Sequence, residues 1–342
     1  MNKRLKAILL YVGGFGLGGG LLYLALRNIS FAALWHNLQA ADTGLIVLAL
    51  VASLAAHYAR GLRWSMLLGA AGHPVSSLRT SAAVMVGYMV NYAVPRLGEV
   101  TRCSLLIKTN RIPLLVSGGT VVTERVVDVL LLGLLLLTVL LGDYERITGY
   151  FQLAQNPLDT LPLWAVLLAV GVMLIIGLLL LRLRRRIARI PVLASLWGFV
   201  RRLLNGMLSI LHLRHPWVFV LLSLLIWVGY WATTYFFVES LPIGRGHGLW
   251  FSLVLTTMGG VGMTLPVPGG IGPFHQAIAT TFLLYGLGQD TGVMVALVLH
   301  TPQLLLNVVV GGLSYVYLLF QQPTAESAEP AAAQAAADQT GQ

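Results

Sequence analysis

The sequence predicts an all-α polytopic membrane protein built from two inverted repeats, with six full transmembrane helices and two broken re-entrant hairpins. Three observations predict this fold. Only 10% of the 342 residues are charged, whereas an ordinary soluble domain carries about 25%. Apolar runs follow one another along the chain, and two stretches are interrupted by proline and glycine. The basic residues gather at the ends of the apolar runs, as they do at the cytoplasmic ends of membrane helices.

Six apolar runs are long enough to cross a hydrocarbon layer of about 30 Å at 1.5 Å per residue. These predicted crossings are 5–26, 44–69, 113–141, 162–181, 216–241 and 291–320. In the first, Lys3, Arg4 and Lys6 precede an apolar run from Ala7 to Leu26, which has the length of a full span and no obvious cleavage site after it. We therefore expect an uncleaved helix rather than a signal peptide.

Two further stretches are interrupted where a continuous helix would leave backbone groups without partners in lipid. The stretch 80–107 is broken at residues 95–99, and the stretch 248–287 is broken at residues 266–272. Proline removes a backbone donor, and glycine permits a sharp bend. Each stretch is therefore predicted to turn back inside the membrane and to leave on the side where it entered.

Counting only the six runs as crossings places both termini in the cytoplasm, and every basic cluster then falls on that side of the inner membrane. Each half of the chain runs crossing, crossing, hairpin, crossing. Because three crossings are an odd number, the second half must be inverted relative to the first, which is a common plan among secondary transporters. The predicted membrane domain, 1–320, thus contains repeat one at 1–141 and repeat two at 162–320.

Two segments are predicted to lie outside the bilayer core. The segment 183–214 combines helical apolar spacing with arginines, and it predicts a cytoplasmic amphipathic helix attracted to anionic lipid headgroups. The tail 321–342, rich in Ala, Gln, Glu and Pro, is predicted to be disordered. The net charge of +10 does not indicate nucleic-acid binding, because the basic residues end apolar runs. The lone Cys103 excludes an internal disulfide and a cysteine metal cluster.

Glu124, Arg125 and Asp128 lie in the middle of the predicted crossing 113–141. Ionisable side chains at that depth cost roughly 2.5–3.5 kcal/mol each and usually face a polar cavity or a buried partner. Glu124 and Asp128 share one helical face, with Arg125 three residues before Asp128. Arg125 shared by the two carboxylates would make either a structural network or a gate that opens when cargo enters, and we favour the gate.

Asn91, Arg96, Glu99 and Arg102 surround the first break. Arg96 and Arg102 offer forked donors suited to a phosphate or a carboxylate. Glu99 is expected to hold one of these two arginines in place. The alternative is an Arg–Glu pair that merely closes the hairpin.

Gly269, Gly270 and Gly272 form the second break, and His275 follows it. Glycine amides that precede a helix start can cradle an anion at the positive end of the helix dipole. His275 and His300 are the histidines expected at membrane depth. They could relay a proton, but we favour a structural role as hydrogen-bonded core histidines.

His57 is predicted to lie near a helix end beside Arg60 and Arg63, in a structural role. The neighbouring Trp64 suggests that this segment anchors the chain at the membrane interface. The sequence contains no catalytic triad, metal-ligand spacing or nucleotide loop that we can identify, so we expect neither an enzyme nor a cofactor. Transport would then be driven by a gradient or be passive.

Four motifs together resemble the lysylphosphatidylglycerol synthase/flippase transmembrane family. The motifs are Arg60-x-x-Arg63-Trp64, Asn91-x-x-x-Pro95-Arg96-x-Gly98-Glu99-x-x-Arg102, Glu124-Arg125-x-x-Asp128 and Pro266-x-Pro268-Gly269-Gly270-Ile271-Gly272. The resemblance implies a helical bundle that moves or binds a polar-headed lipid. In the best-known members this bundle flips aminoacylated phosphatidylglycerol and is fused to a soluble synthetase. No such synthetase is recognised here, so lysyl transfer is not expected.

Two positions depart from the family pattern. His275 stands where an acidic residue is usual after the glycine-rich turn, and His300 stands where the last helix usually carries an arginine. If both positions touch the headgroup, the departures imply a different cargo or a different coupling to protonation.

The leading hypothesis is an inner-membrane translocator of an anionic or isoprenoid-linked envelope lipid. Arg96, Arg102 and Arg125 would hold the headgroup in a polar mid-membrane cavity between the two inverted repeats, with Glu124 and Asp128 as counter-charges.

Two alternatives belong to other classes. The chain could be a non-transporting subunit that scaffolds a lipid-modifying or glycosyltransferase enzyme, which would dock on the arginines of 182–214. It could also be an intramembrane enzyme acting on a lipid phosphate.

Overall fold

The computed structural model describes residues 39–153 and 213–321, together with Ala32 and Trp35. This part of the chain is helical and contains no strand. The predicted crossings 5–26 and 162–181 lie outside the described residues, as do the predicted amphipathic segment up to residue 212 and the tail from residue 322.

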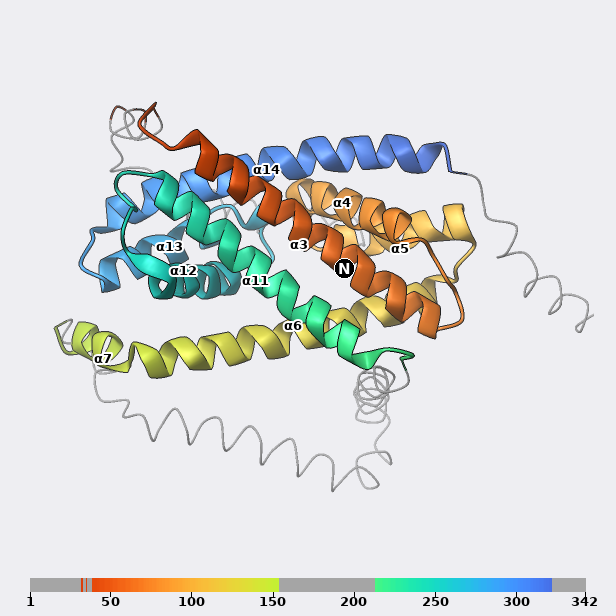
Figure 1. Cartoon of the computed structure of the whole chain (residues 1–342), viewed down its shortest axis with the longest axis horizontal. Helices are drawn as coiled ribbons and strands as arrows, with labels where there is room; N and C mark the ends of the chain where they lie inside the picture. The colour runs from red at the N-terminus through yellow and green to blue at the C-terminus, as the bar shows by residue number, and fades with distance from the viewer. Residues whose placement is uncertain (1–31, 33–34, 36–38, 154–212, 322–342) are drawn as a thin grey trace, which may run out of the picture.

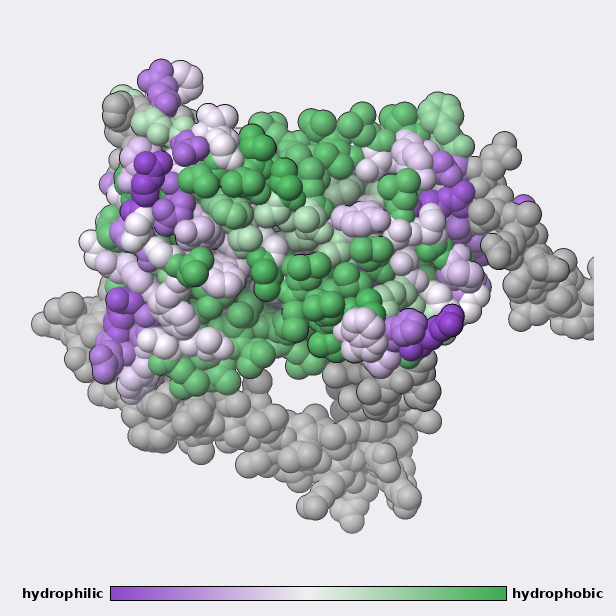
Figure 2. All heavy atoms as spheres, viewed as in Figure 1, coloured by the Kyte–Doolittle hydropathy of each residue, from purple (hydrophilic) through white to green (hydrophobic). Residues whose placement is uncertain are grey.

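Four helices of the described part are long and apolar enough to cross a membrane. They are α3 (Thr43–Ala70), α6 (Leu114–Gly142), α11 (Pro216–Ser240) and α14 (Gln289–Leu319). They coincide within two residues with the predicted crossings 44–69, 113–141, 216–241 and 291–320. On the face shown in Figure 2, apolar residues cover the middle of the bundle, and polar residues gather at its two ends. The chain is therefore a multi-pass helical membrane protein.

Helices α3 and α11 lie side by side along the centre of the bundle and run in opposite directions (Figure 1). Asp42 begins α3, because its Oδ1 accepts hydrogen bonds from the amides of Gly44 and Leu45 at 2.9 and 3.2 Å. Gly229 lets the two backbones approach closely, since a Cβ on it would lie 2.8 Å from the Cβ of Ala56.

The first predicted break separates α4 (Ser77–Ala93) from α5 (Leu97–Asn110). At 17 and 14 residues the helices reach only about 26 and 21 Å, less than a full span. Arg96, with φ 63°, adopts the left-handed conformation that reverses the chain. Gly98 then packs directly on Gly87, because a Cβ on Gly98 would collide with the Gly87 carbonyl oxygen.

The second predicted break separates α12 (Gly248–Met263) from α13 (Pro273–Leu284). A 3₁₀ turn, η2 (Pro268–Gly270), lies between them, and these two helices are also too short to span the membrane. Gly269, Gly270 and Gly272 all have positive φ angles, from 57° to 95°. Glycine adopts such angles without steric cost, which explains the run of glycines in this turn.

The two hairpins occupy opposite ends of the bundle, and their tips meet between those ends (Figure 1). The guanidinium of Arg96 donates to the carbonyl oxygen of Thr264 at 3.1 Å, which joins the two breaks directly. Tyr92 packs against Gly269, where any side chain would collide with the phenol ring. The short helix α7 (Tyr144–Leu153) follows α6 at the end where α12 begins.

Candidate functional site

Asp128 on α6 pairs with two arginines of α3. Its Oδ2 lies 2.7 Å from Arg60, and its Oδ1 lies 2.7 Å from Arg63. Arg63 also donates to the hydroxyl of Ser223 on α11 at 3.2 Å, so that three helices meet at its guanidinium. The exposed fraction of the side chain is 0% for Arg63 and 10% for Asp128. The pair is therefore buried in the bundle.

Glu124 lies one helical turn before Asp128 and faces the same way. Its Oε2 accepts from Arg102 of α5 at 2.7 Å, and its Oε1 lies 3.6 Å from Arg63. The guanidinium of Arg102 stacks 4.5 Å from the ring of Trp64, whose indole N–H donates to Thr120 at 2.9 Å. The i, i+4 spacing of the two carboxylates on one face is thus confirmed.

The expected role of Arg125 as the partner shared by both carboxylates is wrong. Successive helical residues are rotated by about 100°, so Arg125 points away from Glu124 and toward α5. There it pairs with Oε1 of Glu99 at 2.7 Å, while its NH1 lies 3.7 Å from Asp128. Arg63 is the arginine that lies between Glu124 and Asp128. Glu99 accordingly contacts Arg125, and not Arg96 or Arg102 as predicted.

Arg60 and Arg63 are the functional candidates that the sequence reasoning missed. They were expected at the membrane interface, but they lie ten and seven residues before the end of α3, with buried side chains. Two features of the sequence could have identified Arg60 and Arg63 as buried. At 1.5 Å per residue, Arg60 is about 15 Å inside the helix end, and two carboxylates at membrane depth require cationic partners.

These seven charged side chains form one group, which we call the arginine–carboxylate cluster. Its members are Arg60, Arg63, Arg102, Arg125, Glu99, Glu124 and Asp128. Four arginines face three carboxylates, so the cluster carries an excess positive charge. Several of its polar atoms are buried without a hydrogen-bond partner among the described residues, including Oε2 of Glu99 and Oε1 of Glu124. The cluster thus has unused capacity for hydrogen bonding.

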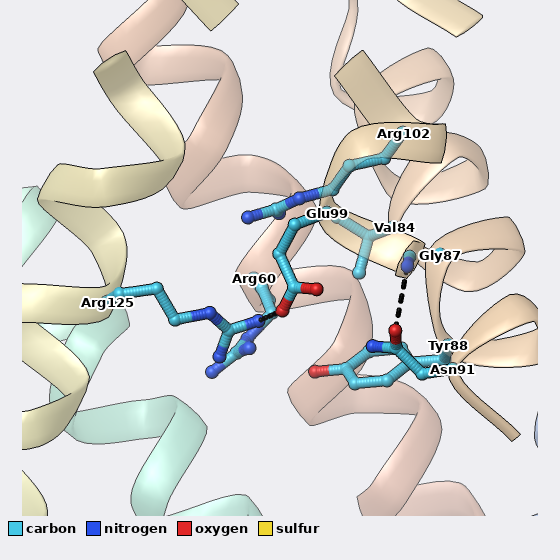
Figure 3. Close-up of a pocket in the computed structure, with 9 residues that line it drawn as sticks. Arg60, Val84, Gly87, Tyr88, Asn91, Glu99, Arg102 and Arg125 are labelled. Atoms are coloured by element: carbon cyan, nitrogen blue, oxygen red, sulfur yellow. Dashed lines mark hydrogen bonds and ion pairs between the residues drawn. The ribbon is translucent and has the colours of Figure 1, made fainter. Parts of the chain in front are cut away.

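A small polar pocket opens beside the cluster (Figure 3). Arg125 of α6 points toward Glu99 in this pocket, and Arg60 of α3 is among the other residues that line it. On the other wall, Oδ1 of Asn91 accepts from the Gly98 amide at 2.7 Å, which fixes the two arms of the first hairpin together. The pocket has room for about one water molecule. The pocket is lined only by residues of the first predicted repeat, so it is not the expected cavity between the two repeats, and in this conformation it is too small for a lipid headgroup.

Exposure differs strongly within the cluster. The side chains of Arg125 and Glu99 are 43% and 25% exposed, whereas those of Arg102 and Glu124 are 4% and 2% exposed. An ion pair near the surface is weakly held. The Arg125–Glu99 pair is therefore the part of the cluster that a ligand can most easily separate.

Arg96 is not part of this cluster. Its side chain is exposed at the tip of the first hairpin, where it contacts Thr264. Its backbone is left-handed at the N-cap position of α5.

The remaining predicted residues form a second group around the second break. The rings of His275 and His300 lie 5.1 Å apart between centroids, and both residues are buried. The amide of Gly272 donates to Nδ1 of His275 at 3.4 Å. Gly269 and Gly270 are buried in the turn beside them. The structure thus divides the predicted site into the arginine–carboxylate cluster and this histidine group.

The prediction that His57 lies near a helix end is wrong. It is the fifteenth of the 28 residues of α3, and its exposed fraction is 6%. Its ring lies 4.5 Å from Tyr88 and 6.2 Å from Tyr230. These two tyrosines also flank Arg60, with ring centroids 5.9 and 6.0 Å from its guanidinium carbon. His57 therefore lies at membrane depth beside the cluster.

The chain matches the family model for the lysylphosphatidylglycerol synthase TM region over residues 11–311. The comparisons with curated proteins and with solved structures gave no match. The family match covers most of the chain and includes all the residues of the cluster. The chain therefore belongs to the family of lysylphosphatidylglycerol synthase transmembrane regions.

Proposed function

We propose that this protein translocates a polar-headed, anionic lipid across the inner membrane, and that the arginine–carboxylate cluster binds the headgroup. The single observation that carries the proposal is the excess of arginine over carboxylate in a buried cluster beside a polar pocket. An anionic phosphate would supply the missing negative charge. Guanidinium groups bind phosphate in a bidentate geometry.

Arg125 is the residue we expect to meet the headgroup first. Because its pair with Glu99 is partly exposed, a phosphate can replace the carboxylate at modest cost. Arg60, Arg63 and Arg102 are held by Asp128 and Glu124, and they would supply the positive field behind it. Glu124 and Asp128 thus keep their predicted role as counter-charges.

The hairpins are the elements we expect to move. The pocket lies between α4, α5 and the long helices, and its small volume means that the first hairpin must shift before a headgroup enters. The contact from Arg96 to Thr264 joins the two tips and would break in that step. In the proposed topology the hairpins belong to two inverted repeats and enter from opposite sides, which provides alternating access.

The orientation follows from the charges at the two ends of the bundle. Arg79, Lys108, Arg111 and Arg214 lie at the end where α3 finishes, and that end is cytoplasmic by the positive-inside rule. We further propose that the protein carries out no lysyl transfer and acts without a cofactor.

The test is a flipping assay in reconstituted vesicles with fluorescent phosphatidylglycerol. Arg125→Gln is expected to slow flipping at least tenfold, while Arg79→Gln, in the first turn of α4 and away from the pocket, serves as the matched control. Both variants must retain the wild-type melting temperature. Equal rates in wild type and Arg125→Gln would refute the assignment, and the absence of flipping in the wild type would refute this function for phosphatidylglycerol.

A further inference from the structure

The histidine group at the second break contains two imidazoles in direct proximity. His275 and His300 are 3% and 6% exposed, and their ring centroids are 5.1 Å apart. Nε2 of His300 is buried and has no hydrogen-bond partner among the described residues. Because His275 accepts from the Gly272 amide through Nδ1, its neutral ring carries the proton on Nε2.

No carboxylate pairs with either ring in the described part of the chain. From α13 the pair is faced by Phe274, from α4 by Tyr92 at 6.2 Å, and from the 3₁₀ turn by the backbone of Gly269. Two buried cations 5 Å apart without a counter-charge would be strongly unfavourable. The pair can therefore take up one proton, but not two.

Tyr92 connects this pair to the headgroup pocket. It contacts His300 and Gly269 of the second half, and its hydroxyl accepts from the Asn307 amide at 3.3 Å. On its own helix it directly follows Asn91, which lines the pocket and fixes Gly98. A change at the histidine pair that displaces Tyr92 is thus transmitted to the first hairpin.

We propose that His275 and His300 form a one-proton binding site that couples headgroup translocation to proton movement. The inference rests on the proposed function. The site takes up one proton from water, which adds one positive charge to a buried group that lacks a counter-charge. An anionic headgroup supplies that counter-charge. Proton and headgroup therefore bind cooperatively, and each favours the other to the same extent.

The coupling is tested by the equilibrium distribution of lipid across vesicles that hold a pH gradient. If one proton accompanies each lipid, fluorescent phosphatidylglycerol accumulates in the leaflet on the alkaline side, by up to about tenfold per pH unit. Accessibility to a membrane-impermeant quencher measures the ratio. His275→Gln and His300→Gln are expected to reduce the ratio to about one, while His215→Gln, an exposed position before α11, retains the wild-type ratio. A wild-type ratio of one, with flipping intact, would overturn the coupling and leave the proposed function standing.

Proton binding is tested separately, without any transport, by NMR of ¹⁵N-histidine in lipid nanodiscs. The signals of His275 and His300 are expected to titrate together with one midpoint, and His300→Gln should move the His275 midpoint by more than about half a pH unit. His215→Gln should leave it in place. Independent midpoints, or no titration of either ring, would overturn the proton site. This measurement tests the proton site even if the wild type does not flip the lipid probe.

Discussion

Arg63 and Asp128 form an ion pair of 2.7 Å, although they lie 65 residues apart in the chain and the Arg63 side chain has no exposed surface. The pair joins α3 to α6 in the apolar middle of the bundle. Arg60 binds the other oxygen of the same carboxylate at 2.7 Å. One carboxylate thus neutralises much of the charge of two buried guanidinium groups, so the packing of α3 against α6 depends on it.

Asp128→Asn is expected to destabilise the protein strongly. The amide keeps the size of the side chain but leaves Arg60 and Arg63 without their main counter-charge. Removing one partner of a buried ion pair typically costs about 3–5 kcal/mol. Thermal unfolding in detergent, followed by size-exclusion fluorescence, measures the effect. Asp290→Asn, at an exposed position in the first turn of α14, is the control and should cost less than about 1 kcal/mol. Equal melting temperatures for the two variants would contradict this account.

The positions of the long helices and of both breaks could be predicted from the sequence. The apolar run lengths gave α3, α6, α11 and α14 within two residues. Proline and glycine marked the breaks at 95–99 and 266–272, because neither residue continues a helix in lipid. Helical periodicity also placed Glu124 and Asp128 on one face. These features depend only on residues that are close together in the sequence, so they can be predicted from it.

The partners of the charged residues could not be predicted in the same way. Arg63 reaches Asp128 only because α3 lies against α6 at that height, and this position depends on how the whole bundle packs. Arg96 lies outside the cluster, exposed at the tip of the hairpin and in contact with Thr264. Ion pairs between residues far apart in sequence follow from tertiary packing, and hydropathy carries no information about which helix faces meet.

Gly98→Ala is expected to disrupt the first hairpin. A Cβ at this position would collide with the Gly87 carbonyl and would lie 2.7 Å from the side chain of Asn91. Overpacking of this kind costs about 1–3 kcal/mol, and it should also weaken the hydrogen bond that fixes the pocket wall. Melting temperature and flipping rate are the measurements.

Gly133→Ala on α6 is the matched control for that substitution. Nothing lies within 4 Å of a Cβ at Gly133, so alanine should be neutral or should stabilise the helix by up to about 1 kcal/mol. A loss of stability as large as that of Gly98→Ala would show that close backbone contact is not the reason for the glycine.

Glu99→Gln is expected to increase the retention of anionic lipid. The substitution removes the carboxylate that competes for Arg125, so a phosphate should bind more tightly. A partly exposed ion pair contributes about 0.2–1 kcal/mol, which corresponds to a gain of roughly 1.5–5-fold in affinity. Mass spectrometry of the lipids that co-purify with the protein in mild detergent measures the ratio of anionic to zwitterionic lipid.

Arg125→Gln provides the opposite change and should lower that ratio below the wild-type value. Both variants should change the melting temperature little, because neither side chain is fully buried. An unchanged ratio in both would remove Arg125 and Glu99 from the lipid site.

Tyr285→Phe is expected to loosen the second hairpin at its outer end. The Tyr285 hydroxyl donates to Asp143, which also accepts from Arg146 at 2.7 Å and from the indole of Trp250 at 3.3 Å. These contacts tie α13 and α12 to the end of α6. A hydrogen bond to a charged group contributes about 1.5–3 kcal/mol, so the melting temperature should fall near neutral pH.

The effect of Tyr285→Phe should also depend on pH. Burial raises the pKa of the Tyr285 hydroxyl above its ordinary value, and the hydrogen bond to Asp143 raises this pKa further. The native state therefore keeps this proton at pH values where the unfolded chain, with a tyrosine pKa of about 10, has released it. The contribution of the Tyr285 hydroxyl to the free energy of unfolding is therefore complete below a pH of about 10 and declines above it. The difference in melting temperature between wild type and Tyr285→Phe should accordingly narrow as the pH rises above about 10. A difference that stays constant or widens there would contradict the buried hydrogen bond.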